Sequence, residues 1–160
     1  MYTREALLDI HDRSQRSLAK LIAHGRALGT EELNRSIAGF GYATVRLQLH
    51  HVIGAEEYWV GVLRGLMLAE DNDALFPTIE SLEEYRRKTA ATTEDYLRGA
   101  SPEELNTPRP MKLWGGREAM LAPARAVLRT QMHVYHHQGQ VLAMCRLLGK
   151  PGGEMDFPLA

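Results

Sequence analysis

The sequence predicts an all-α protein, a four-helix bundle with a long ordered crossover between its third and fourth helices. Four long segments carry apolar residues at helical spacing, and no segment of comparable length shows the alternation typical of a strand. Glycine, proline and polar residues separate these segments, as expected for connections between amphipathic helices. The 160 residues contain no internal repeat or low-complexity tract. We therefore expect a single domain spanning residues 1–160.

The first two helices are expected at about residues 3–28 and 44–65. Gly29 is placed to stop the first helix, and Gly39 and Gly41 break the chain before the second. The first helix carries its leucines and Ile22 on one face, which is the pattern of a helix that packs on a core. The inward stripe of the second helix consists of Val52, Ala55, Trp59, Val62 and Leu66.

The last two helices are expected at residues 81–99 and 123–148. The first of them opens with a Ser-x-x-Glu pattern, in which the hydroxyl and the carboxylate satisfy free backbone amides. Residues 71–77 before it are interpreted as a loop. Residues 100–121 combine prolines and a Gly-Gly pair with apolar side chains, which indicates an ordered crossover such as a short hairpin. Helix 123–148 begins with proline, which is favoured in a first turn because no amide hydrogen is needed there.

Composition excludes several classes of partner and of site. The formal net charge is −1, and Lys and Arg alternate with Asp and Glu instead of forming a basic stripe, so no nucleic-acid partner is expected. No apolar run approaches the ~18 residues of a membrane span, and the N-terminus lacks the apolar core of a signal peptide. We expect a cytoplasmic protein that does not insert into membranes. The single Cys145 excludes an intrachain disulfide and a multi-thiolate zinc site, which leaves histidine and carboxylate as ligands.

Histidines are the residues with the clearest chemical potential. His133 and His137 are four positions apart, so they lie on one helical face and can share a metal ion. In the second helix His51 lies about 60° from the centre of the inward stripe, whereas His50 lies about 160° away and is expected to face water. The same arithmetic places His137 about 60°, His133 about 100° and His136 about 160° from the stripe of the last helix. The candidate metal ligands are therefore His51, His133 and His137.

Other inward polar residues have two interpretations each. His11 lies centrally on the first apolar stripe, where a buried, hydrogen-bonded imidazole is favoured over a fourth ligand. Glu56 could orient a ligand histidine, but an ion pair with Arg46 or Arg64 is slightly favoured. Cys145 shares an apolar stripe and is expected to be an inert buried thiol. Core or boundary packing is favoured over a binding role for three aromatic residues, Trp59, Tyr85 and Tyr96.

Two segments resemble the DinB-like (damage-inducible) family of four-helix bundle proteins. In residues 44–59 a histidine, His51, shortly precedes Glu56 and an aromatic pair, which is similar to the family's second-helix signature. Residues 133–140 read His-Val-Tyr-His-His-Gln-Gly-Gln, which resembles the fourth-helix signature His-x-x-His-His-Arg-Gly-Gln. Gln138 stands in place of the usual arginine, so any role of that cation is in doubt. The family's metal ligands, carried over by motif, fall on the same three histidines.

The resemblance implies a divalent metal ion, zinc or nickel, and a reaction that presents a low-molecular-weight thiol to an electrophile, as in metal-dependent thiol transferases. Three imidazoles leave a coordination position open, which distinguishes a catalytic metal from a structural one. Two alternatives stay open: a hydrolase that uses a metal-bound water, and a non-catalytic metal- or ligand-binding stress-response protein. The resemblance also implies a homodimer, and Met111, Leu113 and Trp114 are candidates for that contact.

Overall fold

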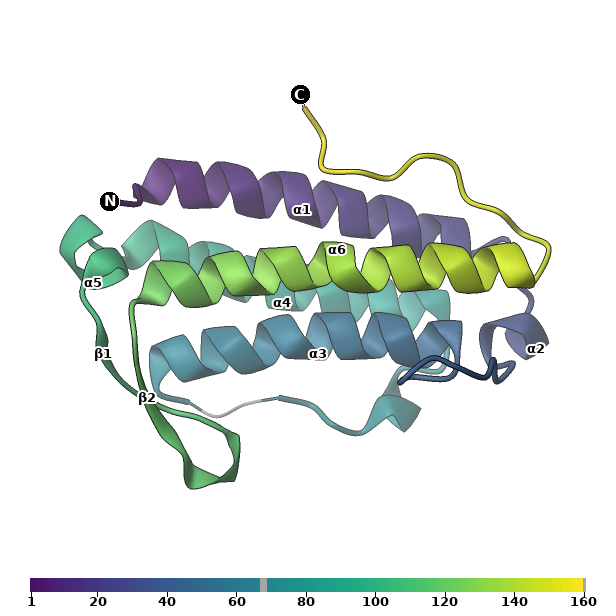
Figure 1. Ribbon diagram of the computed structural model, residues 1–160, viewed down its shortest axis with the longest axis horizontal. Coiled ribbons are helices and arrows are strands. Elements are labelled where there is room, and N and C mark those ends of the chain that lie inside the picture. The colour runs from purple at the N-terminus through teal and green to yellow at the C-terminus, as the bar shows by residue number, and fades with distance from the viewer. Residues whose placement is uncertain (67–68, 160) are drawn as a thin grey trace.

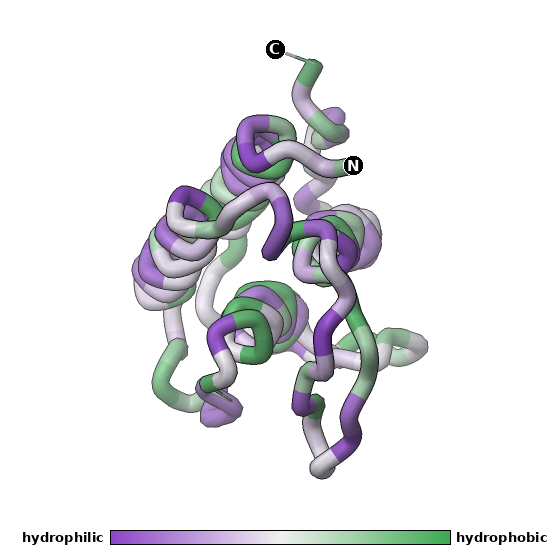
Figure 2. The backbone as a smooth tube through the Cα atoms, turned by 90° about the vertical axis from the view of Figure 1, so that its left-hand side faces the viewer, coloured by the Kyte–Doolittle hydropathy of each residue, from purple (hydrophilic) through white to green (hydrophobic). Residues whose placement is uncertain are grey.

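The computed structural model describes residues 1–66 and 69–159, and these are mainly helical. Four long helices run along the molecule: α1 (Arg4–Gly25), α3 (Val45–Arg64), α4 (Ile79–Gly99) and α6 (Pro123–Leu147). Figure 1 shows them side by side along the long axis, and Figure 2 shows them end-on around a common centre. Helix α3 packs against α4 and α6, and α1 packs against the same two helices. The expected all-α class is confirmed.

Short elements connect the long helices. They are α2 (Thr30–Leu33), the 3-10 turn η1 (Asp73–Leu75), α5 (Pro102–Asn106), β1 (Arg109–Lys112), the turn η2 (Trp114–Gly116) and β2 (Glu118–Leu121). Strands β1 and β2 pair antiparallel, with Arg109 opposite Leu121. The predicted hairpin is therefore present between α4 and α6. It projects from one end of the helices, below α3 in Figure 1.

Two helix boundaries differ from the sequence-based prediction. Helix α1 ends at Gly25, and Gly29 is the N-cap of α2, so the first helix ends three residues earlier than expected. Helix α4 begins at Ile79, because the Thr78 hydroxyl accepts from the Ser81 amide at 3.2 Å while the Ser81 hydroxyl accepts from the Thr78 amide at 3.1 Å. The helix start predicted from the Ser-x-x-Glu pattern at residues 81–84 was wrong, because the Thr78 hydroxyl caps the helix three residues earlier.

The interior is divided into two apolar clusters by a polar belt, which we define as the buried His11, Ser14, Gln15, Glu56, Thr89 and Gln131. Residues on one side of the belt, among them Leu18, Leu49 and Val141, belong to the first cluster. Residues on the other side, among them Leu7 and Val127, belong to the second. Each long helix thus changes from apolar to polar and back again along its inner face.

The C-terminal segment after α6 turns back along α1 (Figure 1). Arg13 donates to the carbonyl of Pro158 at 3.1 Å, and Lys20 donates to that of Glu154 at 3.2 Å. Gln138, which stands where the related signature has arginine, is buried and accepts from the Ser17 hydroxyl at 3.0 Å while donating to the Met155 carbonyl. This residue therefore fastens the C-terminal segment, on the side of α6 that faces α1.

Candidate metal centre

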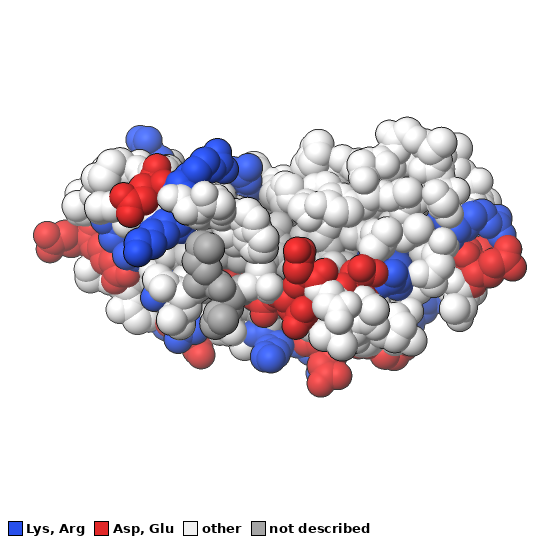
Figure 3. All heavy atoms as spheres, turned by 90° about the horizontal axis from the view of Figure 1, so that it is seen from below, with Lys and Arg blue, Asp and Glu red and all other residues white. Residues whose placement is uncertain are grey.

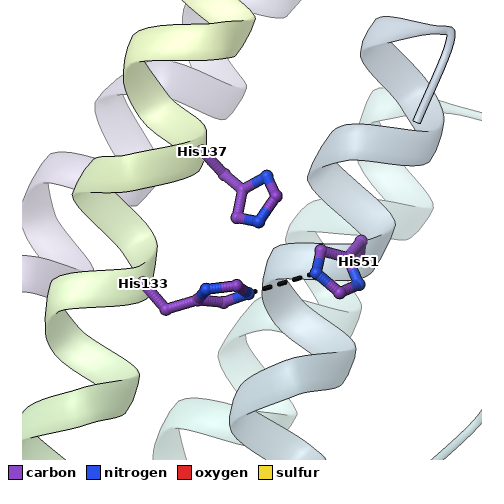
Figure 4. A group of neighbouring side chains, drawn as sticks. All are labelled: His51, His133 and His137. Carbon is purple, nitrogen blue, oxygen red and sulfur yellow. Dashed lines mark hydrogen bonds between the residues drawn. The ribbon is translucent and has the colours of Figure 1, made fainter. Parts of the chain in front are cut away.

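The three histidines selected from the sequence converge between α3 and α6. One nitrogen from each of His51, His133 and His137 lies within 4.8 Å of the other two. His51 Nε2 and His133 Nε2 are 3.1 Å apart, and Figure 4 shows all three rings pointing into the space between the two helices. The spacing within α6 brings His133 and His137 together, and the packing of α3 on α6 adds His51. The predicted convergence of these residues is thus present in the structure.

Burial and crowding keep these imidazoles neutral. Removal from water, reinforced by the charge that a neighbouring imidazole would carry, lowers the pKa of His51, His133 and His137 to about 4 each. At neutral pH each ring therefore has one nitrogen with a free lone pair. A metal ion needs ligands in this state, because a protonated imidazole has no lone pair to donate.

Gln48 fixes the orientation of the His137 ring. The Gln48 amide nitrogen donates to the Tyr42 carbonyl at 3.0 Å and to Gln140 Oε1 at 2.9 Å. Because a backbone carbonyl only accepts, this contact sets which end of the Gln48 amide is oxygen. That oxygen accepts from His137 Nδ1 at 2.7 Å. Nδ1 therefore carries the proton, and Nε2 is left as the nitrogen that can bind a cation.

The hydrogen-bonded chain continues to the surface through α6. The Gln140 amide nitrogen lies 2.9 Å from Nε2 of the exposed His136, so Gln140 donates to His136 while accepting from Gln48. Neither glutamine was predicted from the sequence to be functional. Gln140 could have been found because it ends the fourth-helix signature of residues 133–140, and Gln48 because it lies three residues before His51, and therefore beside it on the helix surface.

A cleft of about 640 Å³ opens beside His51 and His133. Its walls come from α3, the hairpin, residues 69–73 and α6. The Tyr42 ring stacks on His51 with a centroid separation of 4.0 Å and covers one side of that imidazole. Two of the three histidines, His51 and His133, therefore line an open cavity, from which a small molecule could reach an ion held by the triad.

His50 does not face water as predicted. It is only 8% exposed, and its ring lies 5.3 Å from that of Phe76 and 5.8 Å from that of Tyr85, centroid to centroid. Burial lowers the pKa of His50. Helical phase did not predict the burial of His50, because the covering residues lie outside α3. The segment between α3 and α4 folds back over the outer face of α3 and covers His50.

Glu56 has partners different from those expected. Its carboxylate lies 2.9 Å from His11 Nε2 and accepts from the Gln15 amide at 2.5 Å, and all three side chains are buried. Arg46 instead pairs with Asp73 at 2.6 Å. The predicted pairing of Glu56 with Arg46 or Arg64 was wrong, because Glu56 lies on the inner face of α3, where α1 packs and supplies its partners. The expectation for His11, a buried hydrogen-bonded imidazole, is confirmed.

The remaining inward residues have packing roles. The Tyr85 hydroxyl donates to Glu57 at 2.6 Å and the Tyr96 hydroxyl to Glu104 at 3.0 Å, and neither ring lines the cleft. Cys145 is fully buried, and burial raises the pKa of its thiol, so it stays protonated and unreactive. Trp59 is only partly buried and lines the cleft, although sequence analysis favoured the core for it.

The donor set fits a divalent transition metal. A tetrahedral ion with metal–nitrogen bonds of about 2.0–2.1 Å separates its ligand nitrogens by roughly 3.3 Å. The His51–His133 separation of 3.1 Å is close to this value, and the other separations, all within 4.8 Å, need only small rotations of the rings. No protein carboxylate is needed to complete three-coordination, which leaves at least one position for a ligand from the cleft.

Fold and site together define a helical protein with a three-histidine cluster that could hold a metal ion beside an open cleft. A sequence profile described as the DinB superfamily matches residues 10–141, and the chain belongs to that superfamily. A DinB-like protein from Bacillus cereus ATCC 10987 is 21% identical, with a TM-score of 0.75 over 96% of this chain and 100% of its own.

A conserved protein from Enterococcus faecalis is 15% identical, with a TM-score of 0.67 over 93% of this chain and 99% of its own. At these identities the two likenesses establish the fold alone. No protein with a curated description matches the sequence. Among the described residues, no helix is both long enough and apolar enough to cross a membrane.

Proposed function

We propose that the protein holds a divalent ion, zinc or nickel, on His51, His133 and His137, and transfers a low-molecular-weight thiol to an electrophile in the adjoining cleft. The observation that carries this proposal is the convergence of three neutral imidazoles, whose nitrogens lie within 4.8 Å of one another and two of which, His51 and His133, line a cavity of about 640 Å³. When bound, the ion supplies a positive charge that keeps an added thiol deprotonated at neutral pH.

The chain's own residues supply position and environment. Gln48 holds the proton on His137 Nδ1 and so directs Nε2 toward the centre of the triad. The Tyr42 ring lies against His51 and restricts its rotation. His137 is buried and His51 and His133 are partly buried, which lowers the local dielectric constant and strengthens the interaction of any bound anion with a positive charge at this place. His51 and His133 line the cleft, so a thiol and an electrophile can approach the triad from the same cavity.

The test begins with elemental analysis of the purified protein, followed by reconstitution with Co²⁺, whose visible absorption reports both coordination geometry and thiolate binding. We expect one ion per chain, and a sulfur-to-cobalt charge-transfer band when a small cellular thiol is added. His133→Ala should lose both signals. His24→Ala is the matched control, because His24 lies near the end of α1, away from the triad, and bonds to the Lys150 carbonyl at 3.0 Å.

The competing functions predict other results. A hydrolase that uses a metal-bound water would bind the ion but show no charge-transfer band with any thiol, and would cleave esters or amides instead. A non-catalytic stress-response protein would bind the ion without an exchangeable position, and chelation would lower its melting temperature strongly. Either result would remove the thiol-transfer proposal. Size-exclusion chromatography with light scattering tests the homodimer, which we retain as part of the proposal.

A further inference from the structure

The cleft beside the triad has two walls of opposite charge. Arg117 and Arg129 line one end, and Glu70, Asp71 and Asp73 line the other. Figure 3, which views the molecule from below, shows several basic side chains among acidic ones at the hairpin end, and an acidic group near the middle of this face. This separation makes the cleft a dipolar cavity, which favours one orientation of a charged ligand over the reverse.

Arg129 is placed to reach a ligand that lies on the triad. It precedes His133 by four residues on α6, so both side chains lie on one face about 6 Å apart along the helix axis. Its guanidinium lies 5.4 Å from the centre of the Trp59 ring. A guanidinium resting on an aromatic face keeps its charge and its N–H groups available at the edge, which suits it to bind a carboxylate.

Arg117 lines the same end of the cleft as Arg129, but it comes from the hairpin and not from α6. The backbone amide of Trp114 donates to the Tyr58 hydroxyl at 2.8 Å, which fastens the hairpin tip to α3. The Trp114 ring is 58% exposed and lies 6.2 Å from that of Tyr58, so a large aromatic surface faces the cavity. Within residues 1–66 and 69–159, no carboxylate forms an ion pair with Arg117 or Arg129.

One of the three acidic side chains at the other end of the cleft is paired with a cation, and the other two are not. Asp73 is neutralised by Arg46 at 2.6 Å, and its carboxyl pKa is lowered first of all by the hydrogen bond from that guanidinium. Glu70 and Asp71 are exposed and lack a cationic partner among the described residues. An anionic group would be repelled at this end of the cleft and attracted at the other, so both walls favour the same orientation.

We propose that this cleft binds a flat, aromatic or unsaturated carboxylate, with its ring between Trp59 and Trp114 and its carboxylate on Arg129 and Arg117. Arg129 is the specificity-determining residue, and the acidic wall sets the orientation. The inference deepens the proposed function and rests on it for treating the cleft as the substrate site. The electrophile that accepts the thiol would then be an anionic aromatic or conjugated molecule, and neutral analogues would bind less tightly.

The test uses metal-free protein, so that it does not depend on the triad holding an ion. The sequence has two tryptophans, and both line the cleft, so two indole N–H signals in a ¹⁵N–¹H spectrum report binding directly. The probes are 2-naphthoate and its neutral counterpart 2-naphthamide, titrated at pH 7.5, where the triad is uncharged. Trp114→Phe assigns the two signals.

We expect 2-naphthoate to shift both indole signals and Arg129→Gln to raise its dissociation constant roughly tenfold, as typical for loss of one charge-assisted contact. Arg125→Gln is the matched control, since Arg125 is an exposed arginine one turn earlier on α6 that does not line the cleft. It should change the constant less than about twofold. The amide should bind more weakly than naphthoate, and Arg129→Gln should leave its affinity unchanged.

Equal affinities for naphthoate and naphthamide would overturn the proposal, as would an Arg129→Gln protein that binds naphthoate like the unaltered one. Absence of any indole shift at millimolar naphthoate would overturn it too. The proposed function can fail while this inference holds. In that case the cobalt-loaded protein would show no thiolate band, but the metal-free protein would still bind naphthoate more tightly than naphthamide. Asp71→Asn adds a check on orientation, because removal of this repelling charge should leave or tighten naphthoate binding, and weakening would contradict the assigned orientation.

Discussion

Gln48→Met should weaken metal binding without unfolding the protein. The native amide accepts the His137 Nδ1 proton at 2.7 Å and is itself fully buried, held by the Tyr42 carbonyl and by Gln140. Methionine has a similar length but cannot accept this proton well, so His137 loses the contact that fixes its ring and its tautomer. The Kd for zinc should rise about 10- to 100-fold, which corresponds to roughly 1.4–2.7 kcal/mol.

That magnitude follows from the contact itself. A buried hydrogen bond contributes about 1 kcal/mol, and leaving the Nδ1–H unsatisfied in a buried place costs about 1–3 kcal/mol. The measurement is competition between the protein and a chromogenic zinc chelator of known affinity. Circular dichroism should show the same helix content in the variant and the unaltered protein, because the side-chain partners of Gln48, namely Tyr42, Gln140 and His137, lie outside α3.

Gln138→Met is the matched control. Gln138 is also a buried glutamine, 2% exposed, but its amide bonds to Ser17 and to the Met155 carbonyl rather than to the triad. Its replacement should reduce stability and leave the zinc Kd within about twofold. Equal losses of zinc affinity in the two variants would refute the role assigned to Gln48, and so would an unchanged Kd in Gln48→Met.

Three further outcomes are expected. His133→Ala should lose stoichiometric metal in elemental analysis while circular dichroism still reports a helical protein, and retention of tight binding would contradict the assignment. Because the folded pKa of His51, His133 and His137 is about 4 while the unfolded value is about 6.5, the unfolded chain binds more protons between these values. The urea midpoint of metal-free protein should therefore fall as pH decreases from about 6.5 to about 4, more steeply than in a variant with the three histidines replaced by glutamine. His11→Ala leaves the buried Glu56 carboxylate with one fewer partner and should lower the free energy of unfolding by about 3 kcal/mol in urea titrations; a change below about 1 kcal/mol would contradict this account.

The sequence predicted the parts of the fold and site that depend on periodicity. Helical phase placed His51 with His133 and His137 because all three lie beside long apolar stripes, whose burial is decided by the helix itself. The hairpin after α4 was also predictable, since prolines and paired glycines exclude a helix there.

Features that depend on packing between distant segments were not predicted. His50 is covered by residues of the segment after α3, whose path no local pattern of α3 encodes. Glu56 meets His11 because α1 lies against the inner face of α3, and the positions of oppositely charged residues in the sequence did not reveal that partner. No sequence pattern indicated the binding role of Arg129, because that role depends on its contact with Trp59 and on the hairpin across the cleft.

The polar belt has a consequence for how the helices align. Apolar surfaces tolerate sliding, since one leucine can replace another in a contact. A displacement of α1 by one turn, about 5.4 Å, would instead break the contact of 2.9 Å between His11 Nε2 and the Glu56 carboxylate. The hydrogen bonds among α1, α3 and α4 thus fix the positions of these helices along their axes. One of them runs from Arg86 to Gln15 at 3.0 Å. Because Ser17 of α1 also donates to Gln138 of α6 at 3.0 Å, α1 links α3 to α6 and helps to fix the height at which His51 of α3 meets the histidines of α6.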